Sequence, residues 1–94
     1  MHSRSLTVPS EVSRRLGELL SDREAVIRVL DGLRDAHQHQ FAGYRTNRDE
    51  SDPDFNFTVP VPLLLRGRMR LIRFSVNDTI SPDHFFVLAV SMSG

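Results

Sequence analysis

The sequence predicts an α+β fold, in which a helical hairpin packs on a small, mainly antiparallel sheet in the order β-α-α-β-β-β. Residues 55–65 alternate between apolar and other residues, two more strand-like segments follow, and residues 10–38 repeat apolar residues at helical spacing. A chain of 94 residues is long enough for one modest core. We therefore expect residues 1–94 to form a single domain.

The strongest strand signal lies in residues 55–65. Every second residue from Phe55 to Leu65 is apolar, which is typical of a strand with one face on a core. Pro60 and Pro62 both occupy even-numbered positions, between these apolar residues. Because proline has no N–H to donate, this pattern predicts an edge strand whose odd-numbered side chains lie beneath the helices.

Two further strands complete a meander over residues 55–92. Residues 69–76 follow a short turn at 66–68, and residues 85–92 follow a turn-rich loop. The last of these strands is apolar on both faces, which is typical of a strand with a neighbour on each side. Pairing with residues 3–8 would supply the second neighbour.

The N-terminal half predicts two helices, at about residues 10–20 and 22–38, because apolar residues recur in both at helical spacing. Pro9-Ser10 is expected to supply the first N-cap. Ser21-Asp22-Arg23-Glu24 matches a capping box, with the serine bonding the Glu24 amide. The two helices would then form a tight hairpin.

One long helix over residues 10–38 is the rival. Positions 12, 16, 19, 23, 26, 30 and 33 follow heptad spacing, interrupted only by Arg23, so such a helix would pair with a second copy. Gly17 and the capping box both weaken a continuous helix. The hairpin is therefore preferred, and the homodimer stays as the alternative.

Residues 38–54 are predicted to be a long polar loop, with Phe41 and Tyr44 as its anchors. A loop of this length in a small domain is expected to be either functional or mobile. Its acidic residues are interpreted as a solvated turn: Asp49, Glu50, Asp52 and Asp54.

The composition excludes several classes of function. The chain has no cysteine for a disulfide or thiolate metal site, and its 4 histidines show no compact ligand spacing. All 12 basic residues are arginine, which excludes a lysine base or Schiff base. Net charge is zero and every apolar run is too short for a bilayer. We expect a cytoplasmic protein without metal, cofactor or membrane contact.

A basic stretch without an acid among its members is the candidate binding site: Arg66, Arg68, Arg70 and Arg73. Guanidinium groups match phosphate and carboxylate oxygens bidentately, so RNA or a protein partner is expected there. His84 is a candidate base, but strand geometry separates it from Arg68 by about 20 Å. No catalytic residue is assigned.

The element order and three short segments resemble the RelE/ParE superfamily of toxin–antitoxin toxins. Residues 6–12 look like its first strand and helix, 67–72 like its glycine, arginine and aliphatic strand, and 87–90 like its last strand. The resemblance implies a small α+β toxin wrapped by a cognate antitoxin. Acidic residues of that antitoxin are expected to face Arg68, Arg70 and Arg73.

Ribonuclease members of that superfamily cut mRNA on the ribosome with clustered basic residues, and other members poison DNA gyrase. Here only Arg70 matches the strand arginine, and the chain ends Ser91-Met92-Ser93-Gly94 without the usual basic or aromatic residue. Any ribonuclease activity is therefore expected to be weak.

The expected function is a toxin-like component of a type II toxin–antitoxin system, acting on mRNA at the ribosome or on another macromolecule. The alternative is a non-enzymatic interaction module, dimeric through the N-terminal helices.

Overall fold

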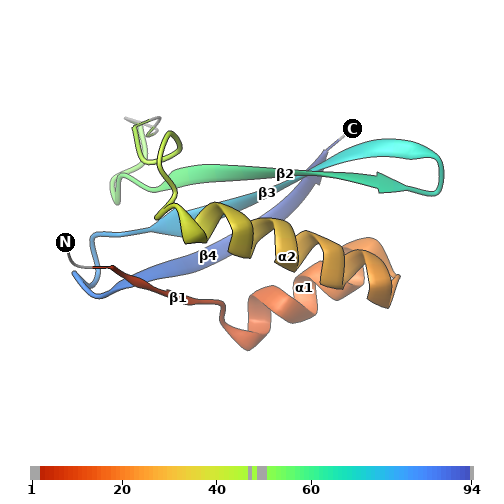
Figure 1. Ribbon diagram of the computed structural model, residues 1–94, viewed down its shortest axis with the longest axis horizontal. Helices are drawn as coiled ribbons and strands as arrows, with labels where there is room; N and C mark the ends of the chain where they lie inside the picture. Colours follow the sequence, from red (N-terminus) through yellow and green to blue (C-terminus); the bar gives the residue numbers. More distant parts are fainter. Residues whose placement is uncertain (1–2, 47, 49–50, 94) are drawn as a thin grey trace.

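The computed structural model describes residues 3–46, 48 and 51–93, and these have the expected α+β architecture. Both helices lie on the same face of one four-stranded sheet (Figure 1). Neither helix is long and apolar enough to cross a membrane. The elements are β1 (Ser5–Thr7), α1 (Ser10–Leu20), α2 (Arg23–Gln38), β2 (Phe57–Leu65), β3 (Arg68–Asn77) and β4 (His84–Ser93).

Two helices, rather than one, occupy residues 10–38, as preferred from the sequence. Ser21 ends α1 in a left-handed backbone conformation, φ 51°, and Asp22 caps α2 by accepting from the amides of Glu24 and Ala25. The prediction that Ser21 is the cap is wrong, because this serine makes the chain reversal between the helices. The Pro9-Ser10 cap is also wrong, since Pro9 occupies the N-cap position without a side-chain bond.

The sheet has the strand order β1-β4-β3-β2, with β1 parallel to β4 and the other pairs antiparallel. The predicted edge position of β2 is confirmed, and its odd-numbered residues from Phe57 to Leu65 are buried. The strand begins later than predicted, because Phe55 has a φ of 53° and is 52% exposed.

The predicted pairing of the N-terminal segment with the last strand is also confirmed, but it is short. β1 contacts only the start of β4, from His84 to Phe86. A register shift between Ser75 and Val76 marks a bulge in the β3–β4 ladder further along. On the β1 side, the edge of β4 from Val87 onward is therefore without a strand among the described residues.

Aromatic rings fill the end of the core where β4 begins. Phe41, from the loop after α2, packs on Phe85 with ring centres 4.9 Å apart and on Phe57 at 5.6 Å. All three rings are buried. Gln40 and Phe41 both have positive φ, 54° and 56°, a backbone strain that the burial of Phe41 offsets. The predicted anchoring of the loop by Phe41 is confirmed.

Helix α2 approaches the sheet closely at Gly32, which faces Val61 of β2. A Cβ added at Gly32 would lie 2.7 Å from a methyl group of Val61, whereas one added at Gly17 of α1 would meet nothing within 4 Å. Only glycine therefore fits at Gly32 without a shift of the strand or the helix.

This contrast predicts opposite effects of two glycine-to-alanine changes. Gly17→Ala should raise the free energy of unfolding by about 0.5–1 kcal/mol, because alanine restricts the unfolded chain and favours helix. Gly32→Ala should lower it by about 1 kcal/mol, because Val61 is stiff and the overpacking exceeds that gain. Urea denaturation of both variants measures the difference, and equal stabilisation by the two would contradict the close approach.

Candidate functional site

The four arginines predicted as one binding site lie in three different environments. Arg66 and Arg68 are exposed at the turn between β2 and β3. Arg70 pairs in register with the buried Leu63, so its side chain lies on the helix side of the sheet. Arg73 is exposed on the opposite, helix-free face, where it donates to the Ser93 hydroxyl. They form no single cluster.

Arg73 and His84 share the helix-free face of the sheet but lie at different ends of it. On the helix-free face, Arg73 lies between Pro60 of β2 and Ser91 of β4 in the strand register. His84 is on the same face, since it alternates with the buried Phe85, but it lies about 20 Å from Ser91 along β4. Arg73 and His84 are therefore too far apart to act on one phosphate.

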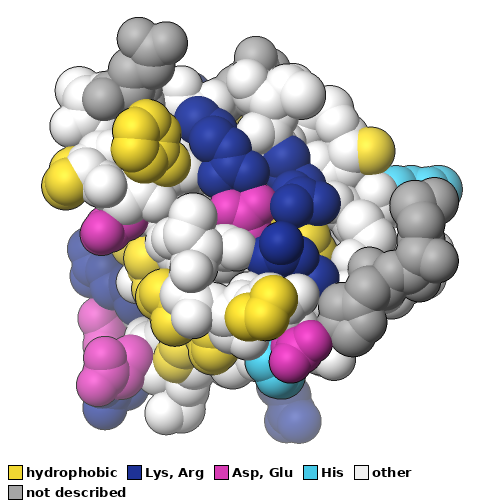
Figure 2. Space-filling model, turned by 90° about the vertical axis from the view of Figure 1, so that its left-hand side faces the viewer, with side chains coloured by type: hydrophobic (Ala, Val, Ile, Leu, Met, Phe, Trp, Pro, Cys, Tyr) yellow, Lys and Arg dark blue, Asp and Glu magenta, His cyan; other side chains and the backbone are white. Residues whose placement is uncertain are grey.

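A different set of arginines converges at the end of the sheet where β4 begins. Figure 2 shows basic side chains gathered around one acidic side chain on this end of the molecule. We name these residues the arginine cluster: Arg4, Arg45, Arg48 and Asp78.

Asp78 is the centre of the arginine cluster, with only 4% of its side chain exposed. Arg48 donates to both carboxylate oxygens, at 2.7 Å and 2.6 Å, and Arg45 donates its Nε to Oδ2 at 3.1 Å. Arg4 donates instead to the main-chain carbonyls of Asp78 and Ser81. One residue thus joins the N-terminal segment, the loop after α2 and the β3–β4 turn.

These contacts set the ionisation of the cluster. The hydrogen bonds from Arg48, and then those from Arg45, hold the pKa of Asp78 below its ordinary value, against the opposing effect of burial. The same contact with Asp78 raises the pKa of Arg48. The carboxylate of Asp78 is therefore ionised at neutral pH, and the Arg48 guanidinium stays charged.

The surrounding polar residues hold the cluster in place. Gln40 and His37 bond the main chain of Arg4, with the His37 Nε2 donating to the Arg4 carbonyl at 2.7 Å. The buried Asn77 accepts from the amides of Thr79 and Ile80, which shapes the turn that carries Asp78. His37 thus has a structural contact with the N-terminal segment.

A groove of about 520 Å³ runs beside the uncovered edge of β4. We name it the edge groove, and it is lined by Pro9, Glu11, Val12 and Arg15 from the start of α1 and by residues 87–90 of β4. Leu88 is 43% exposed there. The groove combines a strand edge that lacks a described neighbour with a mixed wall, in which Glu11 and Arg15 accompany Pro9 and Val12. An exposed strand edge beside side-chain pockets can accept an extended peptide.

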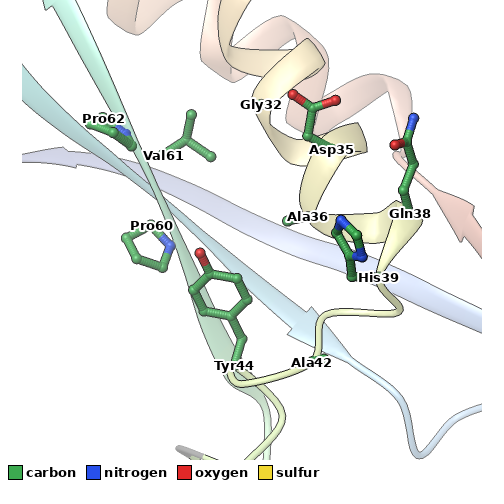
Figure 3. A pocket seen from close by; sticks show the side chains of 10 residues that line it. All are labelled: Gly32, Asp35, Ala36, Gln38, His39, Ala42, Tyr44, Pro60, Val61 and Pro62. Carbon is green, nitrogen blue, oxygen red and sulfur yellow. The ribbon is translucent and has the colours of Figure 1, made fainter.

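A second groove, of about 730 Å³, separates the end of α2 from β2. Figure 3 shows Tyr44 lying beside Pro60 of β2, with Asp35 and His39 on the α2 side. These polar groups are spread around the opening, and no hydrogen bond joins them among the described residues. In the described part of the chain, no three His, Asp or Glu side chains are placed to hold a metal ion. We assign no chemistry to this groove.

The acidic turn lies partly outside the described residues, since Asp49 and Glu50 are among those not described. Asp54 is exposed, and Asp52 accepts the amide of Asp54 at 2.8 Å, as in a local turn. The interpretation of these two residues as part of a solvated turn agrees with this geometry.

Comparison with protein-family models, with curated proteins and with solved structures found no match. Functional assignment therefore depends on the geometry of this chain.

The ionised state of Asp78 predicts a pH dependence of stability. Because its pKa is lower in the folded chain than the ordinary value of 3.8, its contribution is complete above that value and is lost as the pH falls through the folded-state pKa. Asp78→Asn should lower stability at pH 7 by about 2 kcal/mol and flatten the acid limb of the profile. Urea denaturation from pH 2 to 7 measures both; an unchanged acid limb would contradict the assignment.

Proposed function

We propose that this protein is a binding domain of the toxin–antitoxin type, and that its antitoxin adds an extended segment along β4 in the edge groove. The observation that carries the proposal is the strand edge from Val87 to Ser93, which no described strand covers and which lines the edge groove over residues 87–90. The order β-α-α-β-β-β, which the resemblance to RelE/ParE toxins implies, supports it further.

The two edges of the sheet differ in their capacity to accept a strand. On β2, Pro60 and Pro62 remove donors from the outer edge, which protects it against pairing. The segment of β4 from Val87 to Ser93 has no proline, so its main chain keeps the N–H and C=O groups that point away from β3. Main-chain bonds would supply affinity, and contact with Leu88 and Val12 would supply specificity. Of these two borders, that of β4 is therefore the better acceptor of a partner strand.

The helix-free face is the proposed contact surface for a macromolecular target such as mRNA at the ribosome. Arg73 supplies one cation there, and hydroxyl groups of Thr58, Ser75 and Ser91 lie near it around a shallow depression. Cleavage of RNA needs an acid and a base as well as a cation, and an arginine stays protonated. We therefore propose binding rather than efficient catalysis on this face.

The alternative function is an interaction module that dimerises through its helices. One observation favours it: Ile27 on α2 is 51% exposed. The reversal of the chain at Ser21 and Asp22 weighs against it, because the heptad seam is divided between two helices.

The edge-groove proposal predicts where partner contact can be blocked. The protein is co-expressed with the product of the open reading frame next to its own gene, and the complex is purified. The amides of β4 between Val87 and Ser93 that point away from β3 should gain protection in hydrogen exchange, because they enter a new ladder. Leu88→Glu should weaken the complex at least about tenfold, since it places a charge against an apolar strand.

Met69→Glu is the matched control, because Met69 is an exposed apolar residue of β3, 63% exposed, on the helix-free face. It should leave the affinity within about twofold. If protection appears instead around Ile27 and Ile27→Glu abolishes association, the helix-mediated alternative holds.

A second prediction concerns catalysis. In a cell-free translation reaction, the purified protein should cleave mRNA no faster than background, because Arg73 has no acid or base within reach among the described side chains of its face. Primer extension across the message measures cleavage. Ribosome-dependent cuts that are lost in Arg73→Ala, but kept in the exposed hairpin variant Arg68→Ala, would overturn this expectation.

A further inference from the structure

We propose that the arginine cluster is a binding site for a phosphate group, on the outer side of Arg4, Arg45 and Arg48. It lies at the end of the sheet where β4 begins, and it goes beyond the antitoxin contact proposed for the edge groove. The first argument is charge: three guanidinium groups converge on a single residue that carries one carboxylate.

A structural ion pair does not need this many cations. Arg48 alone occupies both oxygens of Asp78, at 2.7 Å and 2.6 Å. Arg45 shares Oδ2, which Arg48 already contacts, and Arg4 bonds main-chain carbonyls without touching the carboxylate. The site therefore keeps a surplus of positive charge in a small volume, and the mutual repulsion of these groups falls when an anion binds.

The guanidinium groups are also fixed in place before a ligand arrives. Arg4 and Arg45 lie over the same buried ring, Phe85, at 5.5 Å and 5.2 Å from its centre, and Arg48 lies 5.4 Å from the centre of Phe57. Ring contacts and hydrogen bonds together restrict long side chains that are mobile elsewhere. Less conformational entropy is therefore lost when they bind.

Donors remain for a ligand on the accessible side. Within the described part of the chain, Nε and Nη2 of Arg4 and Nη1 of Arg45 have no hydrogen-bond acceptor. The side chains of Arg45 and Arg48 are 35% and 26% exposed, so solvent reaches the cluster. Planar donor groups at several positions suit a tetrahedral anion. A planar carboxylate needs only one guanidinium group with two parallel N–H donors, as the contact of Arg48 with Asp78 shows.

A phosphate group can come from a free nucleotide or from a nucleic-acid strand, and the experiment separates these sources. The full chain, labelled with ¹⁵N, is titrated with inorganic phosphate, uridine 5′-monophosphate and a short single-stranded oligouridylate at constant ionic strength. The Nε–Hε signals of Arg4, Arg45 and Arg48 should shift and saturate together. Chloride at the same ionic strength should leave them in place.

Matched variants locate the effect. Arg45→Gln removes a cation whose loss leaves Asp78 bonded by Arg48, and it should weaken binding about tenfold. Arg14→Gln removes the same charge from the exposed surface of α1 and should change affinity less than twofold. An oligonucleotide that binds much more tightly than the mononucleotide identifies a strand as the source, and equal affinities identify a free phosphate ester.

The wild-type titration keeps the proposal testable even if Arg45→Gln does not fold. If the three arginine signals do not saturate with any of the phosphate probes, the proposal is wrong. It is also wrong if Arg14→Gln and Arg45→Gln weaken binding equally, because that result would show attraction to diffuse surface charge.

Discussion

The burial of one carboxylate, that of Asp78, is the constraint on which the end of this fold depends. A buried charge without partners costs several kcal/mol, so the chain must bring cations to it. Arg48 and Arg45 come from the loop after α2, and Arg4 comes from the segment before β1. These arginines lie against the buried rings of Phe85 and Phe57. The loop is thereby attached to the sheet through Arg45 and Arg48.

The surfaces of the molecule have separate chemical characters. The edge groove beside β4 offers main-chain groups and apolar side chains, which suits an extended segment of protein. The arginine cluster offers oriented donors and positive charge, which suits an anion. The helix-free face mixes hydroxyl groups with Arg73. A protein partner on the edge and an anion at the end would therefore bind without competing for the same residues.

Local periodicity explains what could be predicted from the sequence. The alternation in β2 indicated its buried face and, through Pro60 and Pro62, its edge position. Successive side chains of a strand point to opposite faces of the sheet, which separates Arg73 from Arg68 and Arg70. Applying this alternation to the sequence would have divided the predicted arginine site. The arginine cluster had no such signal, because Asp78 is 30 positions from Arg48 and 74 from Arg4. Only the packed fold joins residues at these separations.

Pro60 and Pro62 make the outer edge of β2 a poor acceptor of another strand. This limits how many molecules can associate with one copy through β-strand pairing. Growth into an open-ended fibre requires each subunit to offer two competent borders, one for the preceding subunit and one for the next. Of the borders of β2 and β4, only that of β4 from Val87 to Ser93 is free of proline. Strand addition at that border alone would terminate after a single pairing event and would yield complexes of finite size instead of extended polymers.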